Sequence, residues 1–233
     1  SKMLRFHTQT GGSTLTAQQP MNNIMRVTLQ AMAAVMGGTQ SLHTNGFDEA
    51  LSLPTEDAAR MALRTQQVIG YESGVVDTPD PMAGSYLVES LTDEVEKLAW
   101  EYIATIDEKG GAVSAIEQGF QMEEIENSAY EYTKSIDDAS RTIVGVNKFA
   151  MDDEPEPVVF PIDPALEPSQ IQRLKAYKAN RDNAAVESAL AKVKATAEGT
   201  DNVLYSIKEA LRADCTLGEI SDSLREVFGT YTP

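Results

Sequence analysis

Two short segments of this chain combine many kinds of polar side chain that could bind a ligand or take part in catalysis. Residues 37–50 hold amides, hydroxyls, an imidazole and two carboxylates, and residues 7–12 read His-Thr-Gln-Thr-Gly-Gly. Polar groups at this density after a helix are unfavourable in a core and usual at the rim of a binding site. We therefore expect the two segments to form one wall of a ligand site.

His7 and Gln9 alternate along an expected strand, so their side chains should face the same side. Taken alone, such a pair is more often an internal hydrogen-bonded pair of the kind that barrels contain. Gly11 and Gly12 follow at once and favour a ligand site, because glycine at the end of a strand allows a ligand to approach the backbone closely.

The second segment places Gln40 and Ser41 on the next strand and Asn45 in the turn after it. Asp48 and Glu49 resemble the paired carboxylates of an acid–base site. Adjacent residues of a helix or strand point in different directions, so we do not expect these two to share acid–base work.

The sequence gives little support for a metal-binding site or a hydrolase active site. The chain has two histidines and one cysteine, Cys215, and no Ser–His–Asp spacing. We therefore expect no metal ligands in this chain. A single cysteine also excludes an intrachain disulfide and fits a reducing, cytoplasmic location.

The bulk composition limits the class of partner. The chain has 233 residues, 42% of them hydrophobic, and a formal net charge of -17. Such an acidic surface should repel nucleic acids and anionic lipids, so neither is expected as a partner. We see no signal-peptide pattern and no apolar run long enough to span a membrane.

Alternating patterns in residues 4–91 are typical of a parallel α/β fold. We predict strands at residues 4–9, 39–44 and 75–76, and helices at 21–36 and 55–74. A closed parallel barrel needs about eight strands, so the others would have to come from another segment or another chain.

The remainder of the chain is predicted to be mostly helical. Apolar residues recur at helical spacing from Thr92 to Lys109, and residues 142–146 look extended. Further helices are expected at residues 112–119, 120–138, 169–198 with a break near Asn183, 201–213 and 216–228. We divide the chain into a barrel segment 1–91, a helical segment 92–150, a Pro- and acid-rich linker 151–168 and a helical extension 169–233.

Several blocks together resemble one enzyme family, the adenosylcobalamin-dependent methylmalonyl-CoA mutases and related acyl-CoA mutases. The blocks are Arg5-Phe6-His7-Thr8-Gln9-Thr10-Gly11-Gly12, Pro20-Met21-Asn22-Asn23-Ile24, residues 37–54, Asp80-Pro81-Met82-Ala83-Gly84-Ser85-Tyr86 and Ile143-Val144-Gly145-Val146-Asn147-Lys148. The similarity runs from about Leu4 to the end of the chain, and blocks in this order are far more specific than a single motif.

The resemblance implies an α/β fold, the C-terminal part of a (β/α)8 TIM barrel with about strands six to eight, followed by a helical extension. It also implies a partner, because a separate domain or subunit of the family binds cobalamin through an Asp-x-His-x-x-Gly signature. Residues 41–46 nearly match that signature, but Ser41 replaces the aspartate, so we do not expect His43 to bind cobalt. The lower ligand should come from that other domain or subunit, in an oligomeric assembly with the rest of the barrel.

Site roles can be carried over residue by residue from the family. The resemblance implies catalytic roles for His7 and Gln9, cofactor contacts for Gly12, Asn45, Glu49 and Ser52, and substrate contacts for Gln40 and Ser41. Ser52 is a departure from the family, in which a small alanine is common beside the corrin, and Ser13 stands where an aromatic residue is frequent.

The implied activity is the radical 1,2-rearrangement that interconverts methylmalonyl-CoA and succinyl-CoA with adenosylcobalamin. Sister mutases acting on isobutyryl-CoA or ethylmalonyl-CoA are the first alternative, because this segment does not discriminate between acyl groups. The second alternative is a non-catalytic helical module for assembly. We expect the isolated chain to be inactive.

Overall fold

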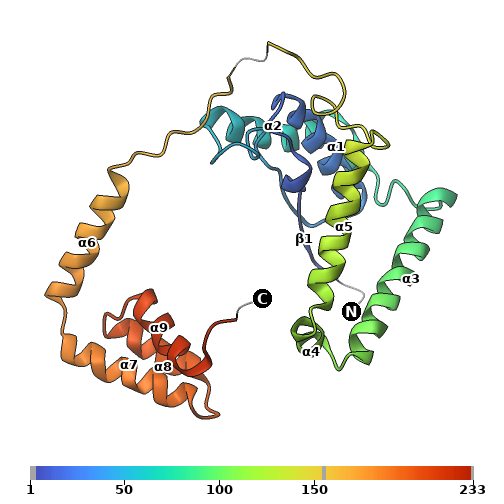
Figure 1. The fold of residues 1–233 in the computed structure, drawn as a ribbon. Helices are drawn as coiled ribbons and strands as arrows, with labels where there is room; N and C mark the ends of the chain where they lie inside the picture. The colour runs from blue at the N-terminus through green and yellow to red at the C-terminus, as the bar shows by residue number, and fades with distance from the viewer. Residues whose placement is uncertain (1–3, 154–155, 232–233) are drawn as a thin grey trace. The chain divides into compact units, whose positions relative to one another are not determined.

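The computed structural model describes residues 4–153 and 156–231, so residues 154 and 155 of the expected linker lie outside the described residues. The chain divides into two compact units, Ser1–Pro161 and Ile162–Pro233 (Figure 1). The chain is mostly helical with a small parallel sheet in the first unit, which is consistent with part of an α/β domain. In the described part, no helix is long and apolar enough to cross a membrane.

The sheet consists of β1, His7–Gln9, and β2, Ser41–His43, which pair in parallel. His7 lies opposite Ser41 and Gln9 opposite His43 in the register. A helix connects the two strands, as parallel pairing requires. The backbone bond from Thr10 N to His43 O, 3.1 Å, continues the pairing past the end of β1.

Two helices cover this strand pair and follow the predicted ranges. The helix α1, Asn22–Met36, buries Asn23, Val27 and Ala31, which recur every fourth residue and so share one face. The helix α2, Glu56–Glu72, packs against α1. Its N-cap is Thr55, whose side chain accepts a hydrogen bond from Ala58 N, as the sequence predicted.

The prediction of a third strand at residues 75–76 is wrong. Val75–Asp77 forms a short 3-10 turn, η2, after Gly74 with φ 70°. Val75 N donates to Ser73 Oγ and Asp77 N to Gly74 O, so these backbone groups are satisfied within the turn and not in a ladder. In the part of the chain that the structure describes, β1 and β2 are the whole sheet, and the barrel strands beyond them are not seen.

Three helices follow in the first unit (Figure 1). They are α3, Tyr86–Glu108, α4, Ala112–Glu117, and α5, Phe120–Asp137, and α3 begins six residues before the predicted start at residue 92. Left-handed backbone at Gly111 and Gly119, with φ 95° and 79°, turns the chain at each end of α4. The α3 and α5 helices run in opposite directions, and the Tyr102 hydroxyl donates to Glu124 across 2.6 Å.

The extended segment predicted at residues 142–146 is instead a tight turn with an isolated bridge between Val144 and Lys148. Asn147 holds this turn, because its Oδ1 accepts from Ile143 N and its Nδ2 donates to Ile136 O and Arg141 O. The β-branched residues suggested a strand, but local side-chain bonds offered the backbone another solution.

The second unit is a helical extension of α6, Leu166–Asn180, α7, Asn183–Ala197, α8, Val203–Arg212, and α9, Leu217–Phe228. The break near Asn183 and the capping box of Thr216 with Glu219 are both as predicted. Its core contains Val186, Val193, Ala210, Cys215 and Ile220.

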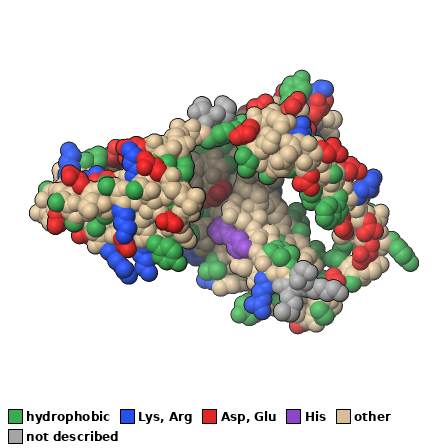
Figure 2. Space-filling model, turned by 90° about the horizontal axis from the view of Figure 1, so that it is seen from below, with side chains coloured by type: hydrophobic (Ala, Val, Ile, Leu, Met, Phe, Trp, Pro, Cys, Tyr) green, Lys and Arg blue, Asp and Glu red, His purple; other side chains and the backbone are tan. Residues whose placement is uncertain are grey.

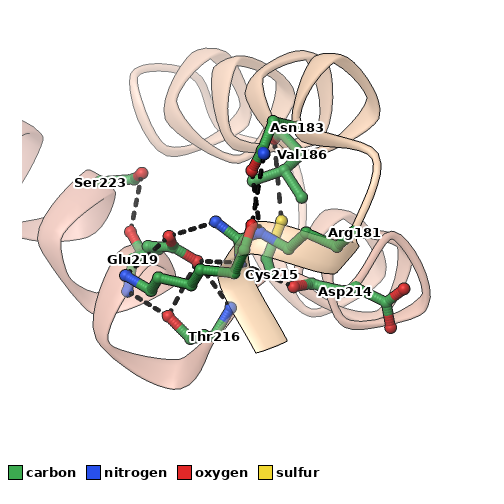
Figure 3. A network of polar contacts seen from close by, with 9 residues as sticks. Arg181, Asn183, Val186, Asp214, Cys215, Thr216, Glu219 and Ser223 are labelled. Atoms are coloured by element: carbon green, nitrogen blue, oxygen red, sulfur yellow. Dashed lines mark hydrogen bonds and ion pairs between the residues drawn. The ribbon is translucent and has the colours of Figure 1, made fainter. Parts of the chain in front are cut away.

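A polar network joins the ends of three helices in this unit (Figure 3). Arg181, just after α6, binds both carboxylate oxygens of Glu219 on α9, at 2.8 and 2.5 Å, and Lys178 on α6 lies 3.0 Å from the same carboxylate. The Arg181 guanidinium, with hydrogen bonds from Thr216 and Lys178, lowers the pKa of Glu219 far below its usual value. We assign to this network a role in the stability of the unit, because its members bond to one another.

Candidate functional site

One face of the small sheet carries the polar side chains that the sequence singled out. The register places His7 beside Ser41 and Gln9 beside His43, so all four side chains project to the same side. His7 Nδ1 lies 2.8 Å from Ser41 Oγ, at hydrogen-bond distance. Figure 2 shows histidine side chains, in purple, at the surface. The structure therefore joins one predicted catalytic residue to one predicted substrate-binding residue.

Asn45 lies under this face at the end of β2. Its Oδ1 accepts a hydrogen bond of 3.2 Å from Gln9 Nε2, and its backbone N donates to the buried Thr10 Oγ1 across 3.0 Å. Asn45 is 2% exposed, and its Nδ2 has no hydrogen-bond partner in the described structure. A buried amide donor without a partner is costly, which is the mark of a group whose acceptor is missing.

Gly12 approaches the same amide from the loop after β1. A Cβ atom on Gly12 would lie 3.0 Å from Asn45 Nδ2, 3.5 Å from Glu49 Cγ and 3.6 Å from Glu49 Oε1. Three of the four predicted cofactor-binding residues thus come together at one point, although Gly12 and Glu49 lie far apart in the sequence. The space above Gly12 is bordered by an amide donor and an exposed carboxylate acceptor.

Gln40 and Ser52 are placed differently from this group. The Gln40 side chain accepts from Phe6 N at 2.8 Å and donates to Gly38 O at 2.6 Å, so it secures the start of the strand pair. A cavity of about 190 Å³ lies beside Gln40 and Ser41. The Ser52 hydroxyl donates to Leu53 O and accepts from Phe160 N, and it bonds to none of the other site residues.

Asp48 and Glu49 point apart, as expected for adjacent residues. Asp48 is 1% exposed, and its Oδ2 accepts from both Thr55 N, 2.8 Å, and Thr55 Oγ1, 2.9 Å. Glu49 is exposed on the other side of the turn. Asp48 therefore anchors the turn to the start of α2, near the positive end of the helix dipole, and leaves Glu49 free to face a ligand.

Sequence reasoning missed the buried polar residues beneath the site. Thr10, Asn23 and Thr44 are each at most 4% exposed. The available signal was the position of Asn23 on the apolar face of α1, four residues before Val27. A polar residue on a core-facing stripe must be hydrogen-bonded, so it marks a structural link.

Side chains that could bind a metal do not gather in the part of the chain that the structure describes. Among residues 4–153 and 156–231, no group of three or more His, Cys, Asp or Glu side chains could hold a metal ion. Ser41, where the cobalamin signature has aspartate, bonds to His7.

The chain is similar to known mutases along almost its whole length. The family model described as methylmalonyl-CoA mutase matches residues 1–230. The methylmalonyl-CoA mutase of Escherichia coli is 47% identical over 232 residues, covering 99% of this chain and 32% of that protein. The mitochondrial methylmalonyl-CoA mutase of Homo sapiens is 46% identical and covers 99% of this chain and 31% of that protein.

A differently named relative is similar to the same degree. The 2-hydroxyisobutanoyl-CoA mutase large subunit of Aquincola tertiaricarbonis is 43% identical over 233 residues, covering 99% of this chain and 42% of that subunit. The chain thus spans about a third to two fifths of the length of these relatives. The family match over residues 1–230 shows that this chain belongs to the methylmalonyl-CoA mutase family.

Proposed function

We propose that this chain supplies the cofactor-facing end of an adenosylcobalamin-dependent mutase that interconverts methylmalonyl-CoA and succinyl-CoA. The observation that carries the proposal is the meeting of Gly12, Asn45 and Glu49 around an amide donor that lacks an acceptor. Relatives named methylmalonyl-CoA mutase support the reaction class.

The residues present fit the adenosyl part of the cofactor. Asn45 Nδ2 offers an unused donor, and the Glu49 carboxylate can accept hydrogen bonds from two ribose hydroxyls. Gly12 allows its loop to lie close to Asn45 and Glu49, because a Cβ there would lie 3.0 Å from Asn45 Nδ2. When bound, adenosylcobalamin supplies the radical chemistry, and these residues hold and orient it.

The exposed face of the sheet would receive the acyl-CoA. His7 and Gln9 would line the reaction cavity, and Gln40 and Ser41 would lie near the CoA portion. The His7 imidazole, oriented by Ser41, can donate a hydrogen bond to a thioester carbonyl. A site of this kind contributes by orienting the reacting groups and by excluding water.

The rest of the enzyme would complete the site. The finer fold that we propose is the last part of a (β/α)8 barrel, with the other strands, the cobalamin-binding domain and the lower cobalt ligand supplied elsewhere in a cytoplasmic, oligomeric assembly. Many large apolar side chains are exposed on the first unit, among them Leu29 at 73% and Leu87 at 69%. Surfaces of this kind require a partner, so we propose that the isolated chain is inactive.

A sister mutase is the second candidate. The relative named 2-hydroxyisobutanoyl-CoA mutase large subunit is almost as similar as the methylmalonyl-CoA mutases, so this segment does not separate the acyl substrates. Isobutyryl-CoA and ethylmalonyl-CoA belong in the same test. The separate helical unit 162–233 also favours an assembly role for that part of the chain.

The test uses the complete enzyme that contains this chain. Adenosylcobalamin binding is measured by equilibrium dialysis, and turnover is measured on a panel of acyl-CoA substrates. Glu49→Gln should weaken cofactor binding and lower turnover, whereas Glu72→Gln, at the exposed end of α2, should change neither. Turnover restricted to another acyl-CoA would replace the substrate assignment, and unchanged binding in the Glu49 variant would remove the proposed site.

A further inference from the structure

A single buried amide connects the two loops that form the proposed cofactor site. Asn23, on the first turn of α1, is 0% exposed. Its Nδ2 donates to Thr16 O, 2.8 Å, in the chain after β1, and to Phe47 O, 2.8 Å, in the turn after β2. Its Oδ1 accepts from Thr16 N, 3.1 Å. The two loops are thus fixed to each other through one side chain.

The orientation of this amide is determined by its surroundings. Arg26 Nη1 donates to Asn23 Oδ1 across 2.7 Å and to Thr16 Oγ1 across 2.9 Å. A guanidinium has donors and no acceptor, so the atom facing it must be the amide oxygen. The amide nitrogen must then face the two carbonyls, so both donors of Asn23 are directed at the loops.

The loops that Asn23 joins carry Gly12 on one side and Asn45 and Glu49 on the other. A Gly12 Cβ would lie 3.0 Å from Asn45 Nδ2, so the loops are closer than a larger residue at position 12 would allow without a shift. A small change in their separation would move Gly12 relative to the Asn45 donor and the Glu49 acceptor. Positioning of this kind has large effects where a ligand is held by a few directed bonds.

We infer that Asn23 is a positioning residue for the adenosylcobalamin site, which sets the separation of the loops after β1 and β2 without touching the ligand. The inference rests on the proposed function. It adds a residue to which the family resemblance gave no role, and it predicts an effect on cofactor affinity that exceeds the effect on folding.

Asn147, which is exposed where Asn23 is buried, provides a control with the same hydrogen-bond pattern within the same unit. Its amide also donates to two backbone carbonyls, Ile136 O and Arg141 O, and accepts from one backbone N–H, that of Ile143. These bonds hold the turn after α5 and do not join the two site loops. Asn147→Ala therefore removes a similar set of hydrogen bonds without breaking the link between the two site loops.

The experiment measures adenosylcobalamin affinity and melting temperature for the complete enzyme with Asn23→Ala, Asn23→Asp or Asn147→Ala. We expect both Asn23 variants to bind the cofactor at least about tenfold more weakly than the Asn147 variant. The free-energy cost of losing a directed hydrogen bond and leaving a carbonyl unpaired corresponds to a change in affinity of about that size. Asn23→Asp keeps the acceptor for Thr16 N and gains an ion pair with Arg26, but it places an oxygen where the donor to Thr16 O and Phe47 O stood, so it tests the loss of these two bonds.

Each outcome is decisive. Weaker cofactor binding in the folded Asn23 variants, with the Asn147 variant close to wild type, supports the inference. Equal affinity in all three variants overturns it and leaves the proposed function standing. Failure of both Asn23 variants to fold assigns Asn23 a structural role alone and also overturns it. A wild-type enzyme that does not bind adenosylcobalamin overturns the proposed function first, and the inference with it.

Discussion

Gln9 donates a hydrogen bond to Asn45 across 3.2 Å, and this bond connects the end of β1 to the turn after β2. It occupies the oxygen of the Asn45 amide and turns the amide nitrogen toward Gly12 and Glu49. A residue with a proposed catalytic role therefore also orients a residue with a proposed cofactor role.

Gln9 and Asn45 should be energetically coupled. Replacing Gln9 by Leu removes the hydrogen-bond donor to Asn45 Oδ1 and leaves the buried Asn45 amide with one bond fewer. The expected cost in unfolding free energy is about 1 kcal/mol. A double-mutant cycle with Gln9→Leu and Asn45→Ala, measured by denaturant unfolding, should give a coupling of about 0.5–1.5 kcal/mol. Strict additivity of the two changes would contradict the bond.

Gly12→Ala should weaken adenosylcobalamin binding more than it lowers stability. The new Cβ would lie 3.0 Å from Asn45 Nδ2, so the side chain of Asn45 would have to shift, and with it a proposed cofactor contact. Gly11→Ala is the control, because its Cβ would have ordinary contacts, the nearest at 3.6 Å from Gln30 Oε1. Cofactor affinities that fall equally in both variants would show that the effect is not specific to the Gly12 position.

Thr55 should contribute to stability through its hydroxyl. The hydroxyl caps α2 by accepting from Ala58 N and donates to the buried Asp48 Oδ2. Thr55→Val loses both bonds and should cost about 1–3 kcal/mol in unfolding free energy, since a cap and a bond to a buried carboxylate are removed together. Thr55→Ser keeps the hydroxyl and should retain most of the stability. If the two variants unfold at the same denaturant concentration, the hydroxyl has no such role.

Acid should weaken the helical unit 162–233 through Glu219. Its pKa is lowered in the folded chain by Arg181, so the carboxylate stabilises the fold fully above the unfolded value of 4.5 and less as the pH falls below it. Hydrogen exchange of α7 and α9 should show this loss between about pH 5 and pH 3. Glu219→Gln should destabilise the unit at neutral pH by about 2 kcal/mol and flatten this pH dependence.

The control for this experiment is Glu187→Gln on the exposed side of α7, which should keep the wild-type pH dependence. Arg181 is 6% exposed, and its charge loses its partner in the Glu219 variant. A Glu219 variant as stable as wild type at neutral pH would show that the network of Figure 3 contributes nothing.

Local sequence patterns predicted most of the helices correctly. They failed for the strand predicted at residues 75–76, because a strand depends on pairing with a neighbouring strand. The range of α1, the Thr55 cap of α2 and the capping box of α9 depend on residues within a few positions of each other, and all three are confirmed. Residues 75–77 have strand-like side chains but form a turn. A strand needs a paired neighbour, and no pattern within the strand itself reports whether that neighbour is present.

The sequence by itself determined the family and the candidate site residues, because ordered blocks of residues can be read directly from the linear chain. The tertiary structure decided how those residues meet: Gly12 against Asn45, His7 beside Ser41, and Asn23 beneath both loops. Ser52, which the resemblance also named, lies apart from them. Such contacts join residues more than twenty positions apart, and they follow from the parallel register and from the packing of α1 against α2, which short-range spacing does not encode.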